Sequence, residues 1–322
     1  MDKQDKNPLL VVAGPTASGK TGLAVALCLQ TGGEVISADS MQIYRRMNIA
    51  TAKPTMAERC GVPHHMIDIL EPGQSFSVAD YVAHAKQTIA AVHVRGRLPV
   101  VAGGTGLYIS SLADNIAFSP APSDPALRQT LRREAEERGG EYLLEQLAAF
   151  DPETAARLHP NNLGRIIRAI EIYRLSGVTM SSQLQNSRLH PSDYDLCMLG
   201  LAFADRQWLY DRIDARVDQM LANGLLQEAQ EIRELGLSGT AAQAIGYKEL
   251  EGYFTGQCSL QEAVENLKRE TRRYAKRQLT WFRRDPRIRW LEVDRFEGPG
   301  QLVQAALQIM REHWGEKLPR LG

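Results

Sequence analysis

The sequence of 322 residues predicts an α/β fold, in which helices flank a parallel sheet and an all-helical insertion interrupts the chain. Two patterns support this prediction. Short apolar segments alternate with helical segments over the first third of the chain, which is typical of parallel strands joined by helices. Strand patterns are then missing until residue 196. We therefore expect a core domain made of residues 1–118 and 196–322, and an all-helical insertion domain at 119–195.

The first third of the chain contains three short apolar runs, two of which are followed at once by glycine. Such runs are typical of strands buried on both faces of a sheet. Between them, apolar residues recur every three to four positions, as they do on one face of a helix. We predict strands at 9–13, 34–38 and 98–102 and helices at 20–30 and 78–94.

The insertion begins after a proline-rich stretch at 119–122. A proline preceded by aspartate then marks a helix start, because proline is favoured at the first helical position. Glycine pairs and single glycines divide the rest of the insertion into helices, which we place at 125–138, 141–149, 152–158 and 163–175.

Strand character returns at 196–203, where we expect the sheet to resume. Two helical patterns come next, and the chain closes with one more apolar strand pattern and a helix. These elements are predicted at 205–222, 225–235, 288–293 and 300–314.

The longest helix has a clear start, because Ser259 and Glu262 have the spacing of a capping box. One seam of this helix is expected to face the protein: Val264, Leu267, Thr271, Tyr274, Gln278 and Trp281. The basic residues lie off the seam, so we expect a positive outer face: Lys268, Arg269, Arg272, Arg273, Lys276 and Arg277.

Composition indicates a globular chain, with 43% hydrophobic and 24% charged residues. The first apolar run has only five residues, and no later run approaches the length of a membrane span. We therefore expect a cytoplasmic protein without membrane contact. The four cysteines form no Cys-x-x-Cys pair, so the sequence indicates neither a zinc site nor a disulfide framework.

The charge is balanced overall but uneven along the chain. Thirty-eight basic residues offset 38 acidic ones, which argues against nonspecific binding of nucleic acid. Residues 266–290, however, contain ten basic residues and two acidic ones, a net charge of +8. A local basic segment of this kind can contact a specific anionic partner.

The first strand leads directly into a phosphate-binding motif, G-x-x-x-x-G-K-[ST]. Glycines allow backbone amides to curl around phosphate oxygens, and the N-terminus of the next helix favours negative charge. Lysine neutralises a terminal phosphate, and the hydroxyl after it can ligate Mg²⁺. The motif predicts a P-loop NTPase-like fold and a polyphosphate site formed by Gly14, Pro15, Thr16, Ala17, Ser18, Gly19, Lys20 and Thr21.

Asp39 and Thr105 come after the second and third predicted strands. The carboxyl ends of parallel strands meet at one edge of the sheet, so both side chains should lie near the phosphate loop. Asp39 can accept a proton from a nucleophile there, or it can cap a helix or support Mg²⁺. Thr105 can contact substrate or close a tight glycine turn. No carboxylate ends the third strand, which weakens the interpretation as a motor or GTPase.

His64 and His65 are adjacent, but no third ligand stands at a convincing spacing for a metal site. We interpret them as structural residues of a loop.

Seven motifs occur together in this chain: 14–21, 39–44 (Asp-Ser-Met-Gln-Ile-Tyr), 51–54, 61–65, 103–108 (Gly-Gly-Thr-Gly-Leu-Tyr), 244–248 and 280–282. In this order the set resembles the bacterial tRNA dimethylallyltransferases of the tRNA isopentenyltransferase family. The resemblance covers nearly the whole chain.

The resemblance implies transfer of a dimethylallyl group from dimethylallyl diphosphate to N6 of the adenosine 3′ of the anticodon. It implies that the phosphate loop holds the diphosphate, with Mg²⁺ near Thr21, and that Lys20 stabilises the leaving charge. It further implies that Asp39 accepts the N6 proton and Thr105 contacts substrate. Arg128 and Arg216 match family positions that approach the diphosphate or the tRNA.

The same resemblance implies a tRNA anticodon loop as partner, met by residues from several segments. The target base must leave its stack to reach a buried diphosphate. The implied tRNA-binding residues are Asp39, Ser40, Met41, Gln42, Arg165, Arg168, Gln243, Gly246, Tyr247, Lys248, Arg272, Arg273, Lys276, Arg277 and Arg283. We expect a monomer.

Three alternatives stay open at the level of sequence. A relative could prenylate free adenosine nucleotides, although that activity needs neither the insertion nor the basic helix. A small-molecule or polynucleotide kinase shares the phosphate loop and an aspartate base. An RNA-binding module controlled by nucleotide would leave its RNA unchanged.

Overall fold

A computed structural model describes residues 6–116, 118, 123–188, 192–236 and 240–315 of the chain. The chain divides into two compact units: Met1–Ala113 with Asp193–Gly322, and Asp114–Ser192. The sequence placed these boundaries a few residues later, at 118/119 and 195/196. The proline-rich stretch 119–122 lies outside the described residues.

The first unit contains a six-stranded sheet in which every pairing is parallel, with the order β3-β2-β4-β1-β5-β6. The central strand β1 pairs with β4 through Leu10 and Val100 and with β5 through Leu10 and Cys197. The strands are β1 (Asn7–Ala13), β2 (Glu34–Ser37), β3 (His64–His65), β4 (Pro99–Gly103), β5 (Tyr194–Ala202) and β6 (Ile288–Glu292).

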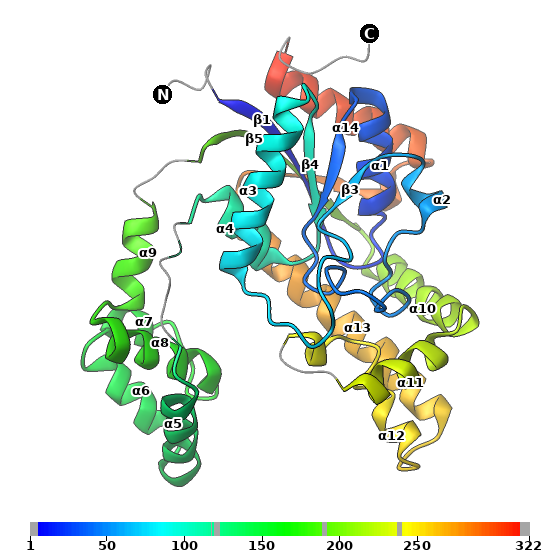
Figure 1. Ribbon diagram of the computed structural model, residues 1–322. Helices are drawn as coiled ribbons and strands as arrows, with labels where there is room; N and C mark the ends of the chain where they lie inside the picture. The colour runs from blue at the N-terminus through cyan, green and yellow to red at the C-terminus, as the bar shows by residue number, and fades with distance from the viewer. Residues whose placement is uncertain (1–5, 117, 119–122, 189–191, 237–239, 316–322) are drawn as a thin grey trace. The chain divides into compact units, whose positions relative to one another are not determined.

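Helices cover both faces of this sheet (Figure 1). Alternate residues of β1 enter different cores: Leu9 and Val11 lie in a core with α3, α4 and α13, whereas Leu10 and Val12 lie in a core with α1 and α14. The sheet is therefore buried on both faces, which explains why its strands are continuously apolar. The helices of this unit are α1 (Lys20–Thr31), α2 (Met56–Arg59), α3 (Val78–Val94), α4 (Gly106–Ala113), α10 (Arg206–Ala222), α11 (Leu225–Leu235), α12 (Glu251–Phe254), α13 (Leu260–Phe282) and α14 (Pro299–Trp314).

The second unit has helices and no strand among its described residues, and its core lies between three of those helices. Leu131, Leu143 and Ile170 are fully buried there. Asp124 caps the first helix by accepting from the amides of Ala126 and Leu127. The helices are α5 (Pro125–Arg138), α6 (Gly140–Ala148), α7 (Pro152–Ala155), α8 (Leu163–Ser176) and α9 (Met180–Arg188).

The fold class predicted from the sequence is confirmed, and most predicted elements differ from the observed ones by one or two residues. The prediction missed one strand, β3, and four short helices, α2, α4, α9 and α12. The strand β3 has only two residues, which is too short to show a period. The predicted helix at 152–158 is shorter and ends at Ala155.

Ser259 begins α13 as predicted: its hydroxyl accepts from the amide of Glu262, and the Glu262 carboxylate accepts from the amide of Ser259. The prediction of a uniformly outward basic face is wrong for two residues. Lys268 and Arg272 form ion pairs with Asp218 and Asp214 of α10, because the two helices pack together.

Candidate active site

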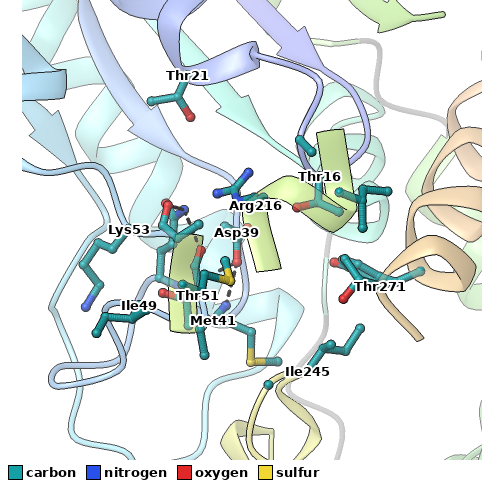
Figure 2. Close-up of a pocket in the computed structure, with 18 of the residues that line it drawn as sticks. Thr16, Thr21, Asp39, Met41, Ile49, Thr51, Lys53, Arg216, Ile245 and Thr271 are labelled. Atoms are coloured by element: carbon teal, nitrogen blue, oxygen red, sulfur yellow. Dashed lines mark hydrogen bonds between the residues drawn. The ribbon is translucent and has the colours of Figure 1, made fainter. Parts of the chain in front are cut away.

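One cavity of about 1040 Å³ lies at the carboxyl ends of the central strands. Every described residue of its lining belongs to the first unit. The wall includes the phosphate loop, the turn after β2, the loop 48–55, the inner side of α10, the segment 243–248 and part of α13 (Figure 2). Ligands of open parallel sheets bind at this edge.

The phosphate loop joins β1 to α1 and has the local backbone that its sequence requires. Gly19 has a left-handed conformation, with φ of +88°, and no side chain caps the helix that it begins. Ala17 also has a positive φ, of +62°. The first-turn amides of α1 therefore carry no capping side chain, as in other anion sites at helix N-termini.

Three cationic side chains line the cavity beside this loop: Lys20, Arg212 and Arg216. Arg212 and Arg216 lie one turn apart on α10, so both face the loop. The Arg212 Nε donates to the carbonyl of Ala17 at 2.9 Å, and the Lys20 Nζ donates to the carbonyl of Pro15 at 3.2 Å. The cluster provides a site for a polyanion. Sequence reasoning included Arg216 but missed Arg212, whose contact crosses 195 positions of the chain.

Burial and mutual repulsion act on these cations. Burial is the main cause that lowers the pKa of Lys20 to about 8; the charge of Arg216 lowers it further, while Asp39 opposes both. Burial also lowers the pKa of Arg216, against the opposing charges of Asp39 and Glu58. The arginine stays charged because its ordinary pKa is so high. A bound polyanion would relieve the repulsion between the two cations.

Asp39 lies two residues after the end of β2, and its side chain lines the cavity near Arg216 (Figure 2). Its Oδ1 accepts from the amides of Met41 at 2.9 Å and Gln42 at 3.4 Å. Within the described residues, its Oδ2 has no hydrogen-bond partner. One oxygen thus fixes the side chain, and the other is available to a substrate. This arrangement suits a general base.

Thr105 lies after β4 but does not line the cavity. Its hydroxyl accepts from the amide of Ser40 at 3.0 Å, and its own amide donates to the carbonyl of Ala38 at 3.1 Å. In this structure Thr105 therefore holds the turn that carries Asp39.

Gln278 joins α13 to the phosphate loop, and sequence reasoning had assigned it only to the helical seam. Its Oε1 accepts from the amide of Thr16, and its Nε2 donates to the carbonyl of Gly104, both at 2.9 Å. The side chain is only 6% exposed. It fixes the relative position of the two loops that come after β1 and β4.

We expect Gln278→Leu to destabilise the protein by about 1–3 kcal/mol, because it removes the partners of the partly buried Thr16 amide and the buried Gly104 carbonyl. Unfolding in denaturant, followed by circular dichroism, measures this loss. Thr280→Ala, at an exposed position of the same helix, serves as the control and should change stability little. Equal stability of Gln278→Leu and the control would contradict the assigned role.

Most of the predicted tRNA-binding residues of the first unit lie at the cavity. Those that line it are Asp39, Ser40, Met41, Gln42, Gln243, Gly246, Lys248 and Arg277. Tyr247 differs, because its ring is buried and its hydroxyl donates to Glu228 at 2.9 Å. Arg273, Lys276 and Arg283 are exposed on or just after α13. Arg272 is half-buried in its ion pair with Asp214.

The remaining predicted residues belong to the second unit. Arg128 and Arg168 both donate to the carboxylate of Glu171, which is fully buried. Arg165 is exposed. The Glu171 carboxylate therefore holds Arg128 and Arg168 within the helical unit.

The two histidines have structural partners, as interpreted from the sequence. His64 and His65 form the edge strand β3; His65 Nε2 lies 2.7 Å from the carboxylate of Glu34, and His64 Nδ1 lies 2.8 Å from the carbonyl of Val62. Among the described residues, no three His, Cys, Asp or Glu side chains cluster as a metal site would require. Thr21, the predicted metal ligand, lines the cavity.

The sequence of this chain matches two protein-family models. The family model described as IPP transferase matches residues 42–285, and the one described as isopentenyl transferase matches residues 8–68. The tRNA dimethylallyltransferase of Desulforamulus reducens is 51% identical over 286 residues, which are 88% of this chain and 99% of that protein. The tRNA dimethylallyltransferase of Caldanaerobacter subterraneus is 47% identical over 293 residues, 90% and 93% of the two chains.

Solved structures give the same result. The tRNA isopentenylpyrophosphate transferase of Bacillus halodurans superposes with a TM-score of 0.73 at 42% identity, covering 97% of this chain and 98% of that one. A eukaryotic dimethylallyltransferase acting on tRNA superposes with a TM-score of 0.79 at 29% identity, covering 95% and 78%. The resemblance seen in the sequence is confirmed. The chain belongs to the IPP transferase family, together with these tRNA dimethylallyltransferases.

Proposed function

We propose that the protein transfers a dimethylallyl group from dimethylallyl diphosphate to N6 of the adenosine 3′ of the anticodon in tRNA. The N6 amine attacks C1 of the dimethylallyl group, the C1–O bond breaks, diphosphate leaves, and Asp39 takes the proton from nitrogen. The observation that supports this reaction most directly is the position of Asp39 Oδ2, which no described residue engages, beside the cationic cluster of the phosphate loop.

The phosphate loop, Lys20, Arg212 and Arg216 would hold the diphosphate. Negative charge grows on the leaving oxygens as the bond breaks, and donors fixed in advance stabilise it most effectively. Mg²⁺ held by the phosphates and the Thr21 hydroxyl would neutralise part of this charge. Mg²⁺ commonly binds with few protein ligands when phosphates and waters supply the others.

Apolar side chains also line the cavity and suit the organic part of the substrates. They include Met41, Ile49 and Ile245, which are labelled in Figure 2, and Met220 and Leu267. An adenine turned out of the anticodon loop would enter here, at a cost of a few kcal/mol for unstacking. The apolar wall offsets part of that cost and excludes water from the reacting carbon.

One experiment separates this function from its alternatives. The purified protein is incubated with unmodified tRNA and dimethylallyl diphosphate, and in parallel with free AMP or with labelled ATP. Nucleoside mass spectrometry should find N6-isopentenyladenosine in the tRNA. Product formed only on free nucleotide, phosphate transferred from ATP, or tRNA bound without covalent change would each support a rival function.

We further propose that the enzyme works as a monomer in the cytoplasm. All groups of the proposed site come from one chain, and tRNA is available in that compartment. No helix among the described residues has the length and apolar character needed to cross a membrane.

The exposed basic residues of α13 should contribute to tRNA affinity through phosphate contacts. Lys276→Gln is expected to flatten the slope of log affinity against log salt by about 0.7–0.9 for one lost contact. Arg272→Gln should have a smaller effect, because Arg272 is engaged with Asp214. Binding of tRNA is measured at several salt concentrations.

Arg289→Gln provides the matched control, since this exposed residue of β6 pairs with Glu312 away from the cavity. It should leave the slope unchanged. Equal slopes for Lys276→Gln and the wild-type protein would place the RNA surface elsewhere.

A further inference from the structure

Glu228 is a buried carboxylate on α11 that lies outside the lining of the cavity. Its two oxygens accept from the amides of three consecutive residues, Asn48, Ile49 and Ala50, at 2.8–3.0 Å. The hydroxyl of Tyr247 donates to the same carboxylate at 2.9 Å. Among the described residues, Glu228 has no cationic partner, so backbone amides and one hydroxyl satisfy its charge.

These contacts join two loops that form one wall of the cavity. The loop at 48–52 is a turn rather than a helix or strand. The amide of Ala52 donates to the carbonyl of Ile49 within it, and Glu228 accepts from the three amides of Asn48, Ile49 and Ala50. The segment 244–248 contacts it directly: a Cβ built on Gly246 would lie only 2.8 Å from the Cβ of Ala50. Ile49, Ala50, Ile245 and Gly246 all line the cavity.

The same loop is connected to the turn that carries the proposed base. The Gln42 Nε2 donates to the carbonyls of Thr51 and Ala52, and the Gln42 amide donates to Asp39 Oδ1. Hydrogen bonds therefore lead from Glu228 through the loop at 48–52 to Asp39. The phosphate loop is held separately, by Arg212 and Gln278.

We infer that Glu228 is a positioning residue that fixes the wall formed by residues 48–52 and 244–248 for the nucleic-acid substrate. This inference rests on the proposed transfer reaction. Because the diphosphate site has its own supports, loss of Glu228 should impair use of tRNA more than use of dimethylallyl diphosphate. Small displacements of a positioning group can lower a rate strongly.

The test is Glu228→Gln, which keeps the shape of the side chain but removes its charge. It also replaces one acceptor oxygen by an NH₂ group, which cannot accept from a backbone amide. We expect kcat/KM for tRNA to fall about tenfold or more, while KM for dimethylallyl diphosphate stays within about twofold of wild type. Glu231→Gln is the matched control, since this glutamate is exposed on the same helix and accepts a hydrogen bond from the side-chain amide of Gln227. Its constants should equal those of the wild-type protein.

Amide hydrogen exchange supplies a second readout. Peptides covering residues 45–55 should lose protection in Glu228→Gln, while peptides covering the phosphate loop keep it. If Glu228→Gln does not fold, Tyr247→Phe removes a single hydrogen bond and should shift both measurements less, in the same direction.

Three results would overturn the role of Glu228. The first is a fall in kcat/KM for tRNA accompanied by an equal rise in KM for dimethylallyl diphosphate, and the second is no change in either constant. The third is loss of amide protection in the phosphate loop as well as in residues 45–55. A wild-type protein that modifies no tRNA would instead count against the proposed function, whatever the variants do.

Discussion

Asp39→Asn is expected to lower dimethylallyl transfer by roughly 10²–10⁴-fold, the usual contribution of a general base. The amide keeps an Oδ1 acceptor for Met41 and Gln42, so the turn should retain its shape. The variant loses the second carboxylate oxygen, which no described residue engages. The loss should therefore fall on kcat. Single-turnover transfer to tRNA measures it.

Binding is the control for this variant. The affinity for tRNA should largely survive in Asp39→Asn, and so should the thermal unfolding midpoint. Loss of binding together with transfer would show that Asp39 acts as a structural residue of the turn. Thr105→Val offers a useful comparison, because it keeps the Asp39 carboxylate but removes the hydroxyl that accepts from the Ser40 amide and holds the turn.

Lys20→Met should lower the rate of transfer by about 10²–10³-fold, because it removes a fixed donor to the leaving diphosphate. The affinity for dimethylallyl diphosphate should fall as well. The methionine has a similar length and leaves the phosphate loop supported by Arg212 and Gln278. Unchanged transfer in Lys20→Met would show that the diphosphate binds elsewhere.

The pH dependence provides a separate test of the same residue. Burial and Arg216 lower the pKa of Lys20 to about 8 in the free protein. In the proposed reaction the protonated amine binds the diphosphate. Affinity should therefore be greatest well below pH 8 and decline as the pH rises through that value, by up to tenfold per unit. Lys20→Arg keeps its charge at these pH values and should show a much weaker decline. Equal profiles for the two proteins would contradict the assignment.

The parallel sheet and the phosphate loop could be predicted because their signals are local. Buried parallel strands are continuously apolar, and the loop requires glycine and lysine at fixed spacing after such a strand. For the same reason, Asp39 was predicted at the correct edge of the sheet from its position after β2. The capping box at Ser259 is equally local, since both partners lie within one turn.

The packing between distant elements could not be predicted in this way. Arg212, Glu228 and Gln278 look in the sequence like ordinary residues of amphipathic helices. Their backbone partners lie 174–262 positions away, and no spacing rule connects them. The same packing turned Lys268 and Arg272 toward the acidic residues of α10 and buried Tyr247.

The sequence by itself determined the sheet, the phosphate site and the acidic residue at its edge, because each depends on short segments whose backbone conformation their own residues dictate. The tertiary structure alone decided which helices complete the site, which charges face the cavity and how the walls are held. Those properties depend on side chains that meet only after the sheet has brought distant segments together.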